Sequence, residues 1–295
     1  MPGVAKKLFM LAAAALLPLA ADHVNGSGSE LNGAPAAELR VMSFNIRTLM
    51  LSDGRDYWAF RRGHVAQLIR KYDPDLAGMQ EVFKSQANDL QRRLPDYAWF
   101  GPPREDGKRV GERCPIFFRK DRLELEAQGT FWLSETPDVP GSRSWDAAFP
   151  RLVTWGRFKQ KSSGAVFYLF NTHFDHMGQT AREMSAKIIL AKISEIAGSE
   201  TFIVTGDFNS APDTSQYQTL AARLRDARAV SSMPPQGPEG TTRDFALDSM
   251  PGERIDYVFA GPGVSVHAFA TLDDTYGAGR RPSDHMPVLA TVQIH

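Results

Sequence analysis

The segment TFIVTGDFNS, residues 201–210, ends a strand-like run with an acid and, two positions later, an amide. Because side chains two residues apart in an extended chain point the same way, Asp207 and Asn209 would face one cavity. A carboxylate there can act as a general base on water, and an amide can donate a hydrogen bond to a developing oxyanion. Gly-Asp-x-Asn is also good turn chemistry, and these two residues alone favour a turn.

Similar polar side chains stand at the ends of five other strand-like segments. They are Asn45 in VMSFNIR, Glu81 in LAGMQEV, His173 in LFNTHFDH, Asp256 in ERIDYVFAG, and Asp284 with His285 in RPSDHMPV. Each residue by itself is compatible with a cap, a turn or a surface position. Oxygen donors gathered with imidazoles are, however, the groups that a divalent-metal-dependent phosphoester hydrolase needs.

The elements that must position these side chains are mostly strands. Eleven segments between residues 38 and 294 are rich in Val, Ile, Phe, Tyr and Trp and are bounded by Gly, Pro, Asp or Asn, which predicts strands. Helical patterns lie between some of them. Residues 60–75 place Val65, Leu68 and Ile69 on one face and stop at Pro74.

A second predicted helix covers residues 180–198. Thr180 and Glu183 have the spacing of a capping box, and Gly198 closes the helix. Its predicted apolar face contains Met184, Ile188, Ile189, Ala191, Ile193 and Ile196.

Many strands and few helices predict an α/β fold, a four-layered sandwich of two mainly antiparallel β-sheets packed face to face with helices outside. A doubly wound parallel fold fits worse, because several strand pairs are separated by turns too short for a crossover helix. With no internal repeat, residues 38–295 are expected to form one catalytic domain.

The order SFNIR, QEV, NTHFDH, GDFNS, IDYVF and SDHMPV resembles the endonuclease/exonuclease/phosphatase superfamily of deoxyribonuclease-like, metal-dependent hydrolases. The resemblance runs from about Arg40 to the C-terminus. Through FWLSETPDVPGSRSWDAAFPRLVTW it is similar to a bacterial branch of the superfamily. It implies that Glu81 binds Mg²⁺ or Mn²⁺, with Asn45 and Asp284 as direct or water-mediated ligands. The oxygen ligands favour such a hard cation over zinc.

The resemblance also implies roles around the scissile phosphate. His173 and His285 would contact it, Asp256 would hold His285 in its tautomer and cationic form, and Glu112 would partner His173.

Two further roles concern the attacking water. Asp207 would orient or deprotonate it for in-line attack, and Asn209 would bind the phosphoryl oxygens. Either Asp207 or a histidine can be the general base on the sequence alone.

Five further residues are candidates for substrate binding. Arg47 and Arg151 lie at strand ends and can hold phosphate oxygens, Trp145 lies in a loop able to cover a substrate, and Arg280 and Arg281 precede Asp284. For each arginine a solvated surface position is the alternative.

Two other side chains have plainer interpretations. Cys114, the single cysteine, is interpreted as a buried structural thiol. His176 is interpreted as a solvent-facing loop histidine, because an i,i+3 pair with His173 faces one way only on a helix; a third ligand is the alternative.

The N-terminus predicts export. Lys6 and Lys7 precede the apolar run LFMLAAAALLPLA, so residues 1–21 are a predicted signal peptide, with an uncleaved anchor as the alternative. Residues 22–37 are a predicted flexible linker. We therefore expect a periplasmic or extracellular protein.

Composition bears on the substrate. Among 295 residues, 34 Lys+Arg balance 34 Asp+Glu, which disfavours tight, sequence-independent binding of long polyanions. The expected function is therefore a phosphodiesterase or phosphatase acting on a small or accessible phosphoester. The alternatives are a DNA or RNA nuclease and a non-catalytic binding module that retains the fold. We expect a monomer without stable membrane insertion.

Overall fold

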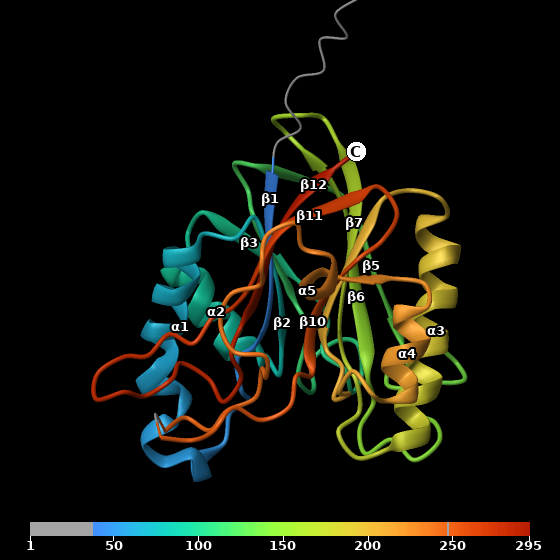
Figure 1. The fold of residues 1–295 in the computed structure, drawn as a ribbon. Helices are drawn as coiled ribbons and strands as arrows, with labels where there is room; N and C mark the ends of the chain where they lie inside the picture. Colours follow the sequence, from blue (N-terminus) through green and yellow to red (C-terminus); the bar gives the residue numbers. More distant parts are fainter. Residues whose placement is uncertain (1–37, 247) are drawn as a thin grey trace, which may run out of the picture. The chain divides into compact units, whose positions relative to one another are not determined.

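The computed structural model describes residues 38–246 and 248–295, in which two six-stranded sheets pack face to face (Figure 1). Helices cover the outer face of each sheet. The predicted four-layered sandwich is therefore confirmed. The predicted signal peptide and linker, residues 1–37, lie outside the described residues.

The first sheet has the strand order β11-β12-β1-β2-β4-β3. β1 and β2 pair in parallel, and the other neighbours are antiparallel. The strands are β1 (Glu38–Asn45), β2 (Leu76–Gln80), β3 (Tyr97–Phe100), β4 (Ile116–Arg119), β11 (Val264–Thr271) and β12 (Val288–Ile294).

The second sheet has the order β5-β6-β7-β8-β10-β9, with β7 and β8 as its parallel pair. Its strands are β5 (Leu123–Trp132), β6 (Leu152–Gln160), β7 (Val166–His173), β8 (Phe202–Asp207), β9 (Arg225–Asp226) and β10 (Asp256–Ala260). The eleven segments predicted as strands all contain one. The two-residue β9 was not predicted.

Helices α1 (Trp58–Tyr72) and α2 (Lys84–Arg93) lie over the first sheet, and α3 (Gln179–Ala197) and α4 (Ser215–Ala221) lie over the second (Figure 1). Short helical segments are η1 (Leu51–Asp56) and α5 (Ala227–Val230). The central strands β2 and β8 are buried at every residue, because each is covered on both faces.

The start of α3 differs from the prediction. Its N-cap is Gly178, and no side chain of the cap residue accepts a hydrogen bond, so the predicted capping box is wrong. The reason is that Asp146, from a distant loop, accepts the backbone N–H groups of Thr180 and Ala181. Asp175 accepts the N–H of Gly178 at 2.8 Å. Two carboxylates from outside the helix thus accept hydrogen bonds from its free N–H groups. Their negative charges also stabilise the positive, N-terminal end of the helix dipole.

The two sheets approach closely beneath one end of the sandwich. A Cβ atom added to Gly78 on β2 would lie 2.2 Å from Oγ1 of Thr205 on β8 and 2.5 Å from Oδ1 of Asn171 on β7. The Asn171 amide also donates to the carbonyl of Met79 at 2.8 Å, and Gln80 donates back to Asn171 at 2.8 Å. Hydrogen bonds between the sheets therefore fix their relative position near the polar strand ends.

Candidate active site

One end of the sandwich collects the polar residues that the sequence places at strand ends. The parallel pairs β1/β2 and β7/β8 finish there with Asn45, Gln80, His173 and Asp207. β10 starts at the same end, because Asp256 is paired antiparallel with Asp207. The loop before β12 arrives there too, since β12 runs antiparallel to β1. Sheet topology alone therefore brings the six segments together.

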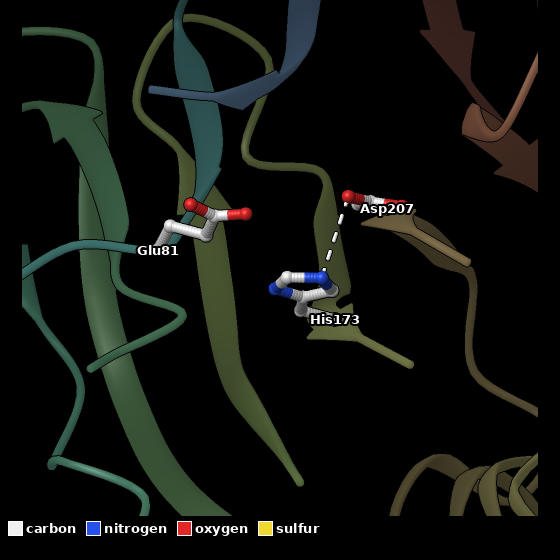
Figure 2. A group of neighbouring side chains, drawn as sticks. All are labelled: Glu81, His173 and Asp207. Carbon is white, nitrogen blue, oxygen red and sulfur yellow. Dashed lines mark ion pairs between the residues drawn. The ribbon is translucent and has the colours of Figure 1, made fainter. Parts of the chain in front are cut away.

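Asp207 lies at the centre of the site and is 1% exposed. Its Oδ2 accepts a hydrogen bond from Nδ2 of Asn45 at 2.9 Å and lies 3.4 Å from Nε2 of His173 and 3.9 Å from Nε2 of His285. Figure 2 shows the side chains of Glu81, His173 and Asp207 directed toward a common space. Glu81 and His285 are therefore in one site, as the sequence predicted.

His285 and Asp256 form a buried pair. Nδ1 of His285 is 2.9 Å from Oδ2 of Asp256, and the hydroxyl of Thr241 accepts the backbone N–H of Asp256 at 3.1 Å. Burial by itself lowers the pKa of His285, but the charges of Asp256 and Asp207 outweigh it and raise that pKa well above its ordinary value. The imidazolium is thus held charged, with Nε2–H turned toward Asp207.

The remaining ionisable groups are shifted in different directions. Burial, and then the charge of Asp256, raises the pKa of Asp207 to about 7. Burial and then Arg151 and Arg104 hold the pKa of His173 well below its usual value, so this histidine is neutral. Burial raises the pKa of Glu81, but hydrogen bonds from Asn45 and Thr48 and the charge of His285 lower it overall. Opposed shifts of this kind are typical of acid–base sites.

The donor set fits a hard divalent cation. Glu81, His173 and Asp207 each offer a ligand atom within 4.8 Å of the others. Glu81 is preorganised, because Oε1 accepts from Asn45 at 3.0 Å and Oε2 from the N–H of Thr48 at 2.8 Å. Asp284 lies beside this group, with Oδ2 at 3.2 Å from Nη1 of Arg47. Carboxylate oxygens dominate this set, as Mg²⁺ or Mn²⁺ requires.

Three residues of the site have left-handed backbone conformations. They are Arg47 (φ 60°), Glu81 (φ 62°) and Asn209 (φ 46°). In Asn209 this conformation lets its N–H donate to Oδ1 of Asp207 at 3.0 Å, while its Nδ2 donates to the carbonyl of Phe174 at 3.0 Å. The amide of Asn209 retains a second hydrogen for a ligand.

These groups open into a cleft of about 470 Å³. Arg47, Thr48, Met50 and Glu81 line it from the first sheet's side. The other lining residues are Arg104, Glu112, Phe149, Arg151, His173, His176, Asp207, Asn209 and His285.

Of the arginines predicted to bind substrate, two line the cleft and two do not. Arg47 and Arg151 line the cleft. Arg280 is paired with Asp56, and Arg281 donates to Asp273 at 2.7 Å, so both are committed to internal ion pairs and do not line the cleft.

The loop containing Trp145 also differs from the prediction. It contributes Phe149 to the cleft, whereas Trp145 is not among the lining residues.

Glu112 also departs from the role that the resemblance implies. Its Oε2 lies 2.7 Å from Nη1 of Arg104, while Nε2 of His173 faces Asp207. The backbone explains the pairing, because the N–H of Arg104 donates to the carbonyl of Glu112 at 2.8 Å and makes the two residues neighbours. A permanent guanidinium charge attracts the carboxylate more strongly than a neutral imidazole does.

Sequence reasoning missed three residues that shape the site: Arg61, Arg104 and Phe149. Arg61 is fully buried on α1 and donates to main-chain carbonyls of the loops that carry Arg47 and Pro282. A signal for it exists, since Arg61 shares the apolar face of Trp58, Val65 and Leu68. Arg104 and Phe149 lie in loops, and no periodic pattern identifies them.

The fold and the site define a phosphoester hydrolase, and the comparisons with known proteins agree. The chain belongs to the endonuclease/exonuclease/phosphatase family, whose sequence profile matches residues 42–285. Members of this family are metal-dependent phosphoester hydrolases, so the prediction of an enzyme is confirmed.

Solved structures of bacterial proteins are similar over nearly the whole described chain. A family member from Bacteroides thetaiotaomicron is 37% identical, with a TM-score of 0.84 over 88% of this chain and 98% of its own. The mannosyl-6-phosphatase of Bacteroides thetaiotaomicron VPI-5482 is 37% identical, with a TM-score of 0.82 over 86% and 99% of the two chains. The predicted bacterial branch is consistent with these neighbours.

The curated relatives are less similar in sequence than these bacterial structures. Nocturnin of Drosophila melanogaster is 23% identical over 302 residues, which cover 84% of this chain and 46% of nocturnin. The chain spans between 34% and 63% of the length of three curated relatives that it matches, nocturnin included. Among residues 38–246 and 248–295, no helix combines the length and apolarity needed to cross a membrane.

Proposed function

We propose that this protein is an exported phosphatase or phosphodiesterase that hydrolyses a small phosphoester with the help of Mg²⁺ or Mn²⁺. The observation that carries the proposal is the convergence of Glu81, His173, Asp207 and His285 on one cleft. An acid, a neutral imidazole and an imidazolium within hydrogen-bonding reach of one space can serve a water molecule and a phosphoryl group together.

In the proposed reaction, the chain's own residues handle the proton and the phosphoryl charge. Asp207 accepts a proton from the attacking water, with Asn45 and the N–H of Asn209 holding its two oxygens in place. The imidazolium of His285, kept charged by Asp256, stabilises negative charge on the phosphoryl oxygens.

His173 and the free amide hydrogen of Asn209 complete the phosphate contacts. A divalent cation held by Glu81, with Asn45 and Asp284 nearby, would supply further positive charge to the same oxygens.

Three observations support a small substrate. The cleft has a volume of about 470 Å³, within the range of small-molecule sites. The chain has no net charge to attract a long polyanion. The similar mannosyl-6-phosphatase from Bacteroides thetaiotaomicron acts, by its name, on a sugar phosphate, and this favours a sugar phosphomonoester for the present chain.

The test is a panel of substrates assayed with and without metal. We expect hydrolysis of p-nitrophenyl phosphate, bis-p-nitrophenyl phosphate or a sugar phosphate that EDTA abolishes and that added Mg²⁺ or Mn²⁺ restores. Asp207→Ala and His285→Ala should each lose at least about a thousandfold in kcat while remaining folded. Near wild-type turnover by either variant would contradict the assignment. Efficient cleavage of plasmid DNA or RNA at low enzyme concentration would indicate a nuclease instead.

Export is part of the proposal and has a separate test. Expression of the full chain in a Gram-negative host, followed by fractionation and N-terminal sequencing, should give a periplasmic protein cleaved near Ala20 or Ala21. A cytoplasmic protein with an intact N-terminus would contradict it.

A further inference from the structure

We propose that Phe149 and His176 form a subsite for the alcohol part of the substrate, and that this subsite selects a polyhydroxylated six-membered ring, a hexose or a cyclitol. This inference rests on the proposed function, because it concerns the group esterified to the phosphate that Asp207 and His285 process. Both residues line the same cleft as these two.

Phe149 provides an exposed aromatic surface in a cleft lined mainly by polar side chains. The residue is 43% exposed. The imidazole of His176 stacks with it at a centroid distance of 5.8 Å and an interplanar angle of 16°. The guanidinium carbon of Arg104 lies 4.6 Å from the ring centroid. The aromatic wall is therefore fixed before any ligand binds.

The backbone on both sides of this wall is anchored to one buried carboxylate. Oδ2 of Asp175, which is fully buried, accepts the N–H groups of Ala148 at 3.0 Å and Phe149 at 3.3 Å. Oδ1 of the same residue accepts the N–H groups of Met177 at 2.9 Å and Gly178 at 2.8 Å. Asp175 thus ties the loop of Phe149 to the loop of His176, and such rigid support is typical of a ligand site.

Arg151 fixes the tautomer of His176. Its Nε lies 3.3 Å from Asp175, and its Nη2 lies 3.1 Å from Nδ1 of His176. A guanidinium can only donate, so in this contact Nδ1 of His176 accepts and the ring hydrogen is placed on Nε2. Among residues 38–246 and 248–295, the hydrogen bond to Arg151 is the one that the ring of His176 makes. His176 lines the cleft, and its Nε2–H is therefore available as a hydrogen-bond donor to a ligand.

Glu112 and Arg104 add a complementary pair of groups to the same wall. Their ion pair, with N···O at 2.7 Å, lines the cleft and lies beside Phe149. The position of Arg104 is fixed in turn, because its carbonyl accepts a hydrogen bond from Nε1 of Trp132 at 2.7 Å. The subsite therefore presents both a carboxylate acceptor and cationic or neutral N–H donors next to an aromatic surface.

This combination matches the chemistry of a pyranose or cyclitol ring. Such a ring has an apolar face of C–H groups that packs against an aromatic side chain, and its rim carries hydroxyls that both donate and accept. A nucleobase would also stack on Phe149, but it has fewer hydroxyl partners for Glu112 and His176. The mixed donors and acceptors thus favour the polyhydroxylated ring.

The test compares substrates that share the phosphate and differ in the alcohol. Mannose 6-phosphate, glucose 6-phosphate and myo-inositol 1-phosphate carry the ring, glycerol 3-phosphate lacks it, and AMP carries a base. In wild-type holoenzyme we expect kcat/KM for a hexose or cyclitol phosphate to exceed that for AMP and glycerol 3-phosphate. Comparison of the two hexoses with myo-inositol 1-phosphate identifies which ring is preferred.

Phe149→Ala should reduce the ratio of kcat/KM between the preferred ring substrate and glycerol 3-phosphate about tenfold, mainly through KM, since one aromatic contact has about this value. His176→Ala should reduce the same ratio in the same direction. The matched control is Phe60→Ala, which removes a 65% exposed phenylalanine from α1, outside the cleft. This control should leave the ratio within twofold of wild type.

A direct binding measurement separates this inference from the proposed function. Calorimetric titration of the metal-free Asp207→Asn protein with the ring phosphates should show binding that Phe149→Ala weakens about tenfold. If wild type hydrolyses no phosphoester but this binding is observed, the proposed function fails and the subsite stands. Equal losses for ring and ringless substrates, no effect of Phe149→Ala, or a preference for AMP would each overturn the subsite.

Discussion

Replacement of Arg61 by methionine should both destabilise the protein and slow catalysis. The guanidinium is fully buried, and burial lowers its pKa to about 10, so it is still charged at neutral pH. It makes five hydrogen bonds to main-chain carbonyls, and the rings of Trp58 and Phe245 lie 5.1 and 5.5 Å from its central carbon. The acceptors are the carbonyl oxygens of Ile46, Arg47, Thr48, Asp56 and Pro282.

The magnitude follows from what the substitution leaves behind. A hydrogen bond from a charged group contributes about 1.5–3 kcal/mol, but burying the guanidinium costs several kcal/mol. Methionine, of similar volume, removes the cost of burying a charge. It also leaves up to five carbonyl oxygens without their hydrogen-bond donor, and water can replace the donor at some of them. We expect the free energy of unfolding to fall by about 3–5 kcal/mol. In Arg61→Lys, three donors replace the guanidinium donors for five acceptors, and the free energy of unfolding should fall by about 2 kcal/mol.

Catalysis should suffer in the folded Arg61→Lys protein. The acceptor carbonyls lie next to Asn45 on one side and two residues before Asp284 on the other, so Arg61 holds two site loops together. A displacement near 1 Å at such a site reduces kcat about a hundredfold.

Urea denaturation and kcat with a phosphoester are the measurements for this prediction, and Arg70→Met, an exposed change on the same helix, is the control. If the free energies of unfolding of Arg61→Met and Arg70→Met differ by less than about 1 kcal/mol, the account of Arg61 is wrong.

Three further predictions concern other parts of the structure. Asp256→Asn removes the charge that keeps His285 protonated, and should lower kcat by a factor of about 10³–10⁴ without a large change in KM; a loss under tenfold would contradict the role of the pair. Gly78→Ala forces a methyl group into the contact between the sheets and should destabilise the protein by about 3 kcal/mol. A Cβ at Gly63 on α1 meets no atom within 4 Å, so Gly63→Ala should stabilise the protein by about 0.5–1 kcal/mol. Burial raises the pKa of Cys114 to about 12, so iodoacetamide at pH 8 should alkylate this thiol only in urea, as measured by mass spectrometry; rapid alkylation of the native protein would show that the thiol is not buried.

The strands were predictable from sequence because their signal is local. Eleven apolar segments are strands, and the polar residues at their ends converge because the topology aligns those ends. α2 was missed, since KSQANDLQRR has only two apolar side chains that pack inward, Ala87 and Leu90. Its other buried residues, Gln86 and Asp89, are polar and gave no pattern.

Interactions between distant loops could not be predicted from the sequence. Asp146 caps a helix more than thirty residues away, and this contact replaces the expected capping box. Arg281 has the residue type of a phosphate ligand, but its partner Asp273 is inside the same loop. Phe149 lies four residues from Trp145 in the predicted loop, and Phe149, whose N–H donates to the distant Asp175, is the one that lines the cleft.

The left-handed conformations of Arg47, Glu81 and Asn209 reduce the stability of the folded protein. Each destabilises a non-glycine residue by about 1 kcal/mol, whereas glycine adopts this conformation without that strain. A library screened only for resistance to heat should therefore enrich glycine at these three positions, and the survivors would be robust proteins without activity. Improvement of this enzyme by directed evolution requires turnover as a second criterion from the first round.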